Sequence, residues 1–480
     1  MTRKLCLLFL FSLVFANSFG QNQQILFDFD QLPQTLMLNP GAEVDYDKHF
    51  GVPFLSNIFF QVGATNKNIT YNNIIVNSDS SGDIFRNIYS QDLKRSDYFK
   101  INQKLEIFNM GYRLKNPKYY LSFGMYQELD GFANYPKELI ELYYEGDDKD
   151  RNGIPEKDIV TNFNEPNIIG DLVGVFHIGL SKKINERLNI GGRFKILSGS
   201  LNINSKSNRG NYYLGNLNMP YQHKFNALNL ELNTSGLINS EGNNIIGGLS
   251  DQVKGLFFMQ GNLGLGLDLG ATYHASEDII VSVSLLDLDY INYGNKVTTY
   301  KVKGNFELDD DNFYNPPDKG QLGYWSNVLS PQHETGQIPI DTLQSSYNNY
   351  RSPKLNTSVK YQIFRESNEN YNSIYRDARY VTPIKDVLVT EFGIQTYTAF
   401  RPNKFDWAIT AFFSRELTKY LNTKITYTYD KFSAKNIGLG LSTHIRDFNF
   451  YATADNLLAL QKLKDSNYQS FQFGMNFIFD

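Results

Sequence analysis

The sequence predicts an all-β fold, a transmembrane antiparallel up-and-down β-barrel of about 14 strands. Three observations support this prediction. The C-terminal segment alternates aromatic with polar residues, and alternating segments of about ten residues recur along the chain. Tight polar turns separate many of these segments, as in a chain of hairpins.

The C-terminal segment shows the alternation most clearly. Phe or Met occupies every odd position from 471 to 479, with Gln472, Gly474 and Asn476 between them. Because neighbouring side chains of a strand point to opposite faces, this pattern places apolar residues on lipid and polar residues toward a lumen. Only Ile478 departs from it. A soluble sandwich strand would look the same over so short a stretch, so the prediction depends on the rest of the chain.

Residues 1–20 have the pattern of a secretory signal peptide. Two basic residues precede an apolar run from Leu5 to Phe15, and small residues follow before Gln21, where the mature protein is expected to begin. The single cysteine, Cys6, lies inside this segment. We therefore expect an exported chain without disulfides, thiolate catalysis or Cys-ligated metals.

Composition indicates one barrel domain over residues 54–480 rather than several soluble domains. The chain has 32 Tyr and 36 Phe but only 2 Trp, and no linker or low-complexity block divides it. Its net charge of −4 offers no basic footprint, so no nucleic-acid partner is expected. No stretch after residue 20 is long and apolar enough for a membrane-spanning helix.

Residues 21–53 precede the first expected strand. Pro33 and Pro40 prevent a long strand in this segment. We expect it to be an N-terminal periplasmic or plug segment that packs inside or beneath the barrel, with a disordered leader as the alternative.

The strand directions follow from the C-terminus, since the last strand of such barrels ends at the periplasmic side. Descending strands are expected near 469–479, 435–445, 405–416, 354–365, 262–275, 171–183 and 99–114. Ascending strands are expected near 447–456, 420–431, 387–400, 278–293, 187–199, 118–130 and 54–64. This even number places the N-terminus on the periplasmic side.

The same topology sorts the connections by length. Periplasmic turns are mostly short, and the outward connections 65–98, 131–170, 200–261 and 294–353 are long, as expected for outer-membrane barrels. The insertion 366–386 breaks this rule, because it is long on the short side. Two outward segments, Asp83 to Leu93 and Pro136 to Tyr144, are predicted to be helical pieces that cover the barrel mouth or contact a partner.

One outward connection contains a candidate calcium loop. Side-chain oxygens at alternating positions are followed by Gly153, as at the start of a loop that wraps a hard cation in oxygen ligands. The twelfth position is Ile159 rather than Glu, so a carboxylate just before it would have to substitute. The alternative to a calcium site is an acidic loop tip that is exposed to solvent and binds no ion. The candidate metal ligands are Asp148, Asp150, Asn152, Glu156 and Asp158.

The sequence predicts no catalytic or cofactor-binding residues, apart from that Ca²⁺ candidate. The six histidines are scattered, and none lies in a metal pair or beside a nucleophile motif. The glycines of 261–270 recur inside a strand pattern and no helix follows them, which favours wall packing over a phosphate loop. We therefore expect a protein that is not an enzyme.

Several short motifs resemble a family of outer-membrane barrel proteins of Bacteroidota that has no established activity. They are Asn39-Pro40-Gly41-Ala42, 191–199, 268–273, Leu285-Leu286-Asp287-Leu288, 454–458 and the aromatic C-terminus. The family is similar in layout to the PorP/SprF barrels, which accompany type IX secretion, and to FadL-like barrels with an N-terminal plug. The resemblance covers nearly the whole mature chain and implies fold rather than activity. The loops 131–170 and 294–353 and the insertion 366–386 exceed the usual pattern, so a shared partner is not implied.

The sequence thus favours a protein of the cell outer membrane, with outer-membrane lipid as its surroundings. Its favoured role is that of a structural or partner-holding subunit of a cell-surface or type IX-like secretion assembly, whose outward loops hold other surface or secretion proteins. The alternative is a FadL-like passive transporter of a small hydrophobic or amphipathic solute.

Overall fold

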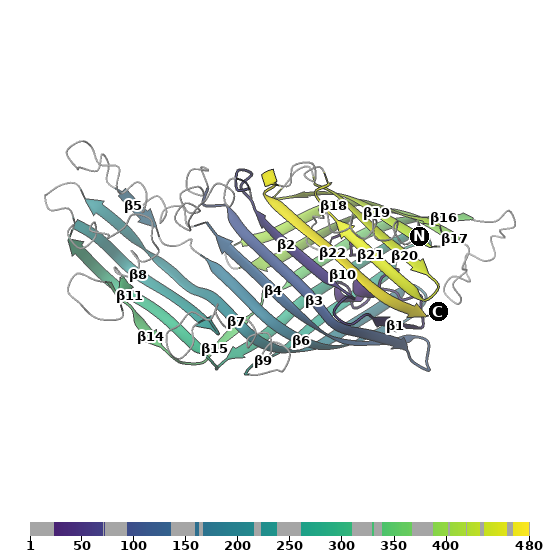
Figure 1. Cartoon of the computed structure of the whole chain (residues 1–480), viewed down its shortest axis with the longest axis horizontal. Helices are drawn as coiled ribbons and strands as arrows, with labels where there is room; N and C mark the ends of the chain where they lie inside the picture. Colours follow the sequence, from purple (N-terminus) through teal and green to yellow (C-terminus); the bar gives the residue numbers. More distant parts are fainter. Residues whose placement is uncertain are drawn as a thin grey trace, which may run out of the picture.

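The computed structural model of the chain contains one closed antiparallel β-barrel (Figure 1). No helix in the part of the chain that is described could cross a membrane. The described residues are 24–70, 72, 94–135, 159–162, 167–215, 222–237, 261–309, 329–330, 338–366, 387–401, 404–418, 420–432, 436–457 and 464–479.

Fourteen strand positions close the barrel, as the sequence predicts. The last strand, β22, pairs on one side with β21 and on the other with β1 and β2, which in turn pair with β3. β1 and β2 form one interrupted position, since residues between them still bond to both neighbours, as Val52 does to Met475 and Phe54 to Ile107. The ring comprises β1 (Lys48–Gly51) with β2 (Ile58–Ala64), β3 (Tyr98–Arg113), β4 (Tyr119–Asn134), β6 (Ile168–Lys183), β7 (Leu188–Gly215), β9 (Asn262–His274), β10 (Ile279–Tyr293), β15 (Tyr347–Tyr350) with β16 (Lys354–Glu366), β17 (Val387–Arg401), β18 (Lys404–Thr418), β19 (Leu421–Asp430), β20 (Asn436–Ile445), β21 (Phe448–Ala454) and β22 (Tyr468–Phe479).

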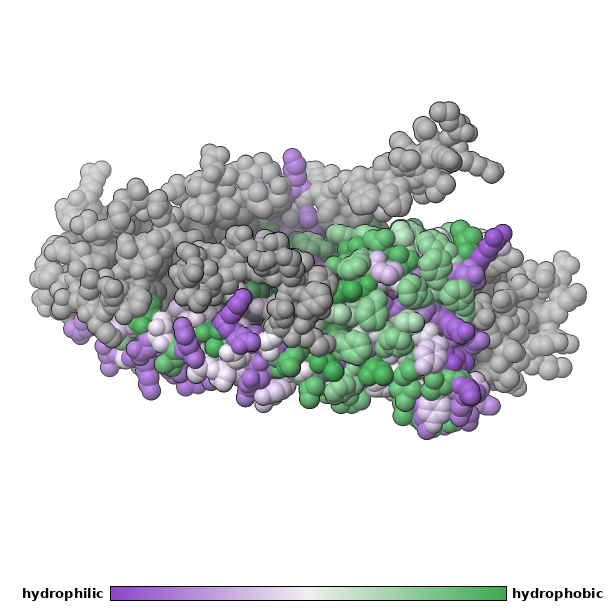
Figure 2. All heavy atoms as spheres, turned by 60° about the horizontal axis from the view of Figure 1, so that its bottom comes forward, coloured by the Kyte–Doolittle hydropathy of each residue, from purple (hydrophilic) through white to green (hydrophobic). Residues whose placement is uncertain are grey.

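The wall is apolar outside and polar inside. On β9, Leu263, Leu265, Leu267 and Leu269 are 40–55% exposed, and the residues between them face inward and are buried or half-buried. Figure 2 shows hydrophobic side chains gathered right of centre, with hydrophilic ones along the lower left and at the right border of this area. This arrangement, the inverse of that in a soluble protein, is typical of an outer-membrane barrel.

The structure of β22 shows why Ile478 departs from the alternation. The odd positions of β22 face outward and the even ones are buried, which confirms the predicted alternation. Ile478, the one aliphatic residue on the inner face of β22, is 3% exposed and packs with Leu36, Ala42 and Tyr46. The departure from the pattern therefore marks a contact with the N-terminal segment.

The lipid-facing assignment predicts a position-dependent cost for charge. Ile394 lies in the middle of β17 and is 58% exposed on the outer face, so Ile394→Arg should destabilise the barrel in lipid vesicles by about 2–4 kcal/mol in a urea titration. Asn229 is an exposed residue of β8 (Gln222–Ser235), beyond the ring, and Asn229→Arg should change stability by at most about 0.5 kcal/mol. Equal losses for the two variants would contradict the placement of the apolar belt.

The expectation that 200–261 and 294–353 are loops is wrong in part. β7 pairs with β9 only as far as Gly199 and with β6 only as far as Asn204, but it continues to Gly215. Its extension pairs with β8, and β8 pairs with β11 (Val297–Asp309), so that these strands run past the others at the left of Figure 1. Shorter strands complete this region: β5 (Ile159–Asn162), β12 (Leu329–Ser330), β13 (Ile338–Pro339) and β14 (Asp341–Leu343).

The missed strands have a physical explanation. From Asn202 to Asn211, β7 is polar at nearly every position, and two register shifts break the period of two. A strand beyond the membrane needs no lipid-facing apolar row, so the signal of a wall strand is absent there. β8 does alternate at Leu228, Leu230 and Leu232, and this pattern would have predicted it.

Candidate functional site: a filled lumen

The N-terminal segment, residues 24–47, runs inside the barrel. Its side chains and carbonyls bond to strands all round the ring: Gln24 to β17, Asp30 to β16, Gln34 to β3 and β22, Asn39 to β9 and Leu38 to β10. One short segment can touch strands on opposite sides of a closed ring only from within. Its one helical turn, the 3-10 helix η1 (Pro33–Met37), begins at Pro33, whose fixed φ suits a helix start.

Two glycines of the barrel wall contact this segment at Asn39-Pro40-Gly41. A side chain at Gly191 would collide with the Pro40 carbonyl, and one at Gly270 would collide with the Asn39 side chain and lie 2.7 Å from the Gly41 nitrogen. The missing Cβ atoms let the backbone approach the wall directly. Asn189 of β7 then donates to the Gly41 and Ala42 carbonyls at 3.1 and 2.9 Å.

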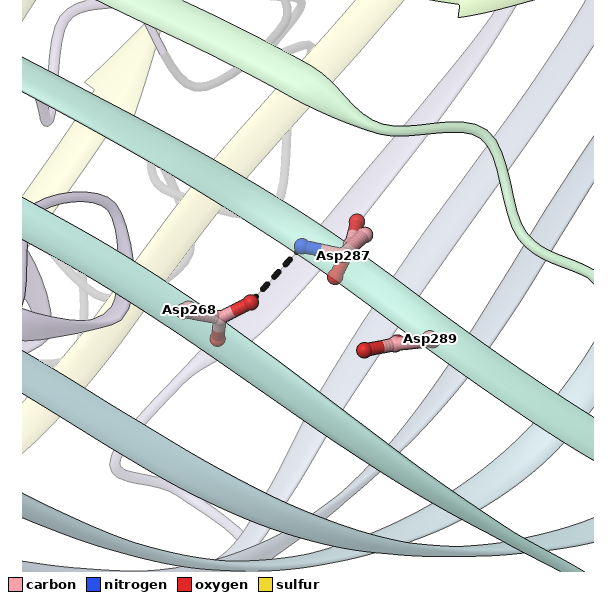
Figure 3. A group of neighbouring side chains, drawn as sticks. All are labelled: Asp268, Asp287 and Asp289. Carbon is pink, nitrogen blue, oxygen red and sulfur yellow. Dashed lines mark hydrogen bonds between the residues drawn. The ribbon is translucent and has the colours of Figure 1, made fainter.

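Above this segment, the buried side chain of Lys195 forms ion pairs with three aspartates. The Lys195 Nζ lies 2.8 Å from Asp268, 2.8 Å from Asp287 and 2.9 Å from Asp289, and its side chain is fully buried. Asp268 also accepts from Arg193, at 2.5 Å. Figure 3 shows the three aspartates turned toward one another, Asp268 from β9 and the other two from β10.

A bulge in β10 puts these aspartates together. The pairing of β9 with β10 shifts between Leu285 and Leu288, and Asp287 has a φ of 60°. The shift turns both Leu286 and Asp287 inward, and the Asp287 N–H donates to Asp268 at 2.7 Å. A left-handed backbone at a non-glycine residue is uncommon, but Asp tolerates it better than most residues.

The lysine belongs to a larger central ion-pair network that crosses the lumen. Arg351 lies 2.9 Å from Glu128 and 3.2 Å from Asp289. Lys354 lies 2.7 Å from Asp287 and 3.5 Å from Asp130, whose carboxylate is also 2.7 Å from Arg401. No ion-pair atom of this network belongs to a side chain more than 11% exposed. The members are Lys104, Glu128, Asp130, Arg193, Lys195, Asp268, Asp287, Asp289, Arg351, Lys354 and Arg401.

The three aspartates could hold a hard cation by their chemistry, because one carboxylate oxygen from each lies within 4.8 Å of the others. The Lys195 ammonium sits against all three at hydrogen-bond distance, where such an ion would bind. The chain thus supplies its own cation at this point. The arrangement joins β7, β9 and β10 through charge pairs that are costly to break one at a time.

Among the described residues, a small cavity lies between the N-terminal segment and the central ion-pair network. It has a volume of about 40 Å³ and lies between Met37 and Leu38 of the N-terminal segment and network members such as Glu128 and Lys354. This volume has room for a few water molecules. The N-terminal segment lies near the short turns, where it contacts Asn189 and Arg113. The central ion-pair network extends toward the other end of the barrel, to Arg401 at the C-terminal end of β17.

The predicted calcium ligands, Asp148, Asp150, Asn152, Glu156 and Asp158, lie outside the described residues, and so do the predicted signal peptide, the two predicted helices and nearly all of the insertion 366–386. The sequence expectations did not include the central network. A signal for part of it was present, since Arg193, Lys195 and Asp268 are charged residues at inward positions of strands that were predicted. Arg351 could not be found this way, because it lies in a predicted loop.

The fold and the apolar belt define an outer-membrane-type β-barrel, here with a filled lumen. The chain belongs to a family of unknown function, DUF5723, whose model matches residues 40–455. The resemblance to PorP/SprF barrels and the origin in Bacteroidota remain predictions from the sequence. No curated protein matches the chain.

The solved structures that match the chain include a FadL homologue and two toluene transporters. A Pseudomonas aeruginosa FadL homologue is 9% identical, with a TM-score of 0.42 and coverage of 94% of this chain and 95% of that one. The Ralstonia pickettii toluene transporter TbuX is 10% identical, with a TM-score of 0.39 over 97% and 99%. The Pseudomonas putida toluene transporter TodX is 10% identical, with a TM-score of 0.34 over 96% and 94%. Likeness of this size does not carry over a ligand or an activity.

Proposed function

We propose that the protein is a non-enzymatic outer-membrane barrel that serves as a structural or partner-holding subunit of a cell-surface or secretion assembly of the type IX kind. The observation that carries this proposal is the filled lumen. The N-terminal segment occupies the half near the short turns as a plug, and the central ion-pair network crosses the half above it. The cavity of about 40 Å³ that the described residues leave between them supports this role over passage of a solute.

The strands beyond the ring support the same role. β7, β8 and β11 project past the rim at the end with the long connections, which is the outer side of such barrels. Elements that extend beyond a rigid barrel offer surface for contact with other components. Surface or secretion proteins are the partners we propose for this end, with outer-membrane lipid around the belt.

A second candidate is passive uptake of a small hydrophobic or amphipathic solute. The cavity favours it in one respect, because Met37, Leu38, Phe59, Leu286 and Tyr397 contribute apolar surface to its lining. Uptake would require the N-terminal segment or the network to move.

Partner copurification and solute uptake separate the two candidates, and electrical recording tests whether the lumen is closed to ions. Full-length protein inserted in planar bilayers should show no stable open-channel conductance, and gently extracted protein should copurify with a stoichiometric partner. A steady conductance from the unmodified monomer, or solute uptake into liposomes that contain only this protein, would overturn the subunit proposal and favour transport.

A further inference from the structure

Nine main-chain carbonyl oxygens of the N-terminal segment accept hydrogen bonds from barrel side chains. Arg193 donates to Leu36 and Met37 at 3.3 and 2.9 Å, and Ser284 donates to Leu38 at 2.6 Å. Within the described part of the chain, these accepting residues are Gln24, Phe27, Leu36, Met37, Leu38, Gly41, Ala42, Val44 and Tyr46.

The donors are arranged for a continuous peptide. Three side chains, Arg193, Asn189 and Arg113, each bond two carbonyls that are adjacent or two residues apart in the sequence. Every peptide presents carbonyls at this spacing, whatever its side chains. Recognition of this kind is therefore tolerant of sequence.

Apolar side chains of the segment fill the space between these donors. Ile25, Phe27, Phe29 and Leu32 form a buried cluster with Tyr451 of β21. Further along, Leu36 and Ala42 pack on Tyr120 and Ile478 of the wall. The lumen thus offers apolar contact together with carbonyl recognition.

We propose that the lumen is a binding site for an apolar, turn-rich peptide, recognised through its main-chain carbonyls, which residues 24–46 occupy in this state. The ligand it takes in their place is an apolar segment of a partner polypeptide. With a hydrocarbon in the apolar contacts, Arg193 would keep Asp268 and Asn189 would keep Ser181. The N–H groups that bond the Leu36, Gly41 and Ala42 carbonyls would lose their acceptors, and that loss is costly. The site goes beyond the subunit role, since no external partner segment enters the argument for that role.

Peptide exchange on the full chain tests the site. A protease cleavage sequence is inserted after Asp47, whose side chain is 63% exposed at the short-turn end, and the folded protein is cut in detergent. A fluorescein-labelled synthetic peptide of residues 24–46 is then added in excess. We expect the labelled peptide to replace the resident one and to coelute with the folded barrel at a ratio near one to one.

Matched variants identify what is recognised. In a second labelled peptide, alkene isosteres remove the Leu36 and Met37 carbonyls and keep both side chains, and this change should weaken incorporation about tenfold or more. Asn189→Leu should weaken incorporation of the unmodified peptide about tenfold, because two bonds are lost. Asn204→Leu on the same strand removes a bond to Asn349 instead and should leave incorporation unchanged.

Three results would overturn the proposal. They are equal incorporation of the two peptides, no exchange of the cut segment over days in native detergent, and unfolding of the barrel once the resident peptide leaves, since the lumen would then not be a preformed site. None of these results alters the conductance expected of the uncut protein, so the proposed function is judged separately.

Discussion

Replacing Lys195 with Met should destabilise the folded barrel by about 3–5 kcal/mol, the usual cost of removing one partner from a buried ion pair. The variant leaves Asp268, Asp287 and Asp289 crowded around an apolar side chain, and each keeps a single close cation in place of two: Arg193, Lys354 and Arg351, respectively. The loss is measured in lipid vesicles by urea titration, with the heat-modifiable gel band as the signal for the folded state.

A second lysine of the same strand is the matched control. Lys206 lies 3.4 Å from Glu231, and its side chain is 64% exposed. Lys206→Met should therefore cost about 1 kcal/mol or less, the range of exposed ion pairs. If the Lys195 variant were as stable as the Lys206 variant, the central ion-pair network would not stabilise the folded barrel.

The same variant should acquire a metal site. With the ammonium removed, three carboxylate oxygens within 4.8 Å of one another remain, a set that suits a hard cation such as Ca²⁺ or its luminescent substitute Tb³⁺. Calcium should restore part of the lost stability of Lys195→Met and should not change that of the parent. Absence of both calcium rescue and terbium luminescence would contradict the inference that Lys195 takes the place of an ion.

Replacing Gly191 with Val should displace the N-terminal segment from the wall. The new side chain would occupy the place of the Pro40 carbonyl and lie against the Gly41 nitrogen, and neither backbone group can move without breaking the Asn189 bonds. Overpacking of this kind costs about 1–3 kcal/mol or more. In limited proteolysis of the folded protein, the segment should be cut rapidly, while the barrel strands stay protected.

The adjacent glycine provides the control. A Cβ at Gly192 would meet nothing nearer than 3.8 Å, because this residue points away from the segment. Gly192→Val should therefore leave the segment as protected as in the parent. Equal protection of the segment in Gly191→Val would show that the close fit at Asn39-Pro40-Gly41 does not hold it in place.

Much of the fold could be predicted because it follows a local rule. A strand between lipid and a lumen must alternate, and the fourteen expected positions agree with the strands of the ring. Where the rule does not apply, prediction failed. The extension of β7 from Asn202 to Asn211 is polar and bulged, so its alternation was lost and a loop was expected.

The site was harder to predict than the wall. The inward charges of Arg193 and Lys195 can be read from strand parity, but their partners cannot. Lys195 meets Asp287 and Asp289 at sequence separations of 92 and 94 residues. The bulge that turns both aspartates inward also contradicts simple parity, and the doublet Leu285-Leu286 is its only visible trace in the sequence.

The sequence by itself determined the class of fold, the number of ring strands and, outside the bulges, the face that each wall residue presents. These depend on a period of two and on the contrast between lipid and water, which every short segment meets on its own. The tertiary structure decided among the places expected for the N-terminal segment, in favour of the inside of the ring, and it alone showed that a lysine neutralises three aspartates. Such contacts exist only after the sheet closes, because closure brings residues far apart in the chain to one buried point.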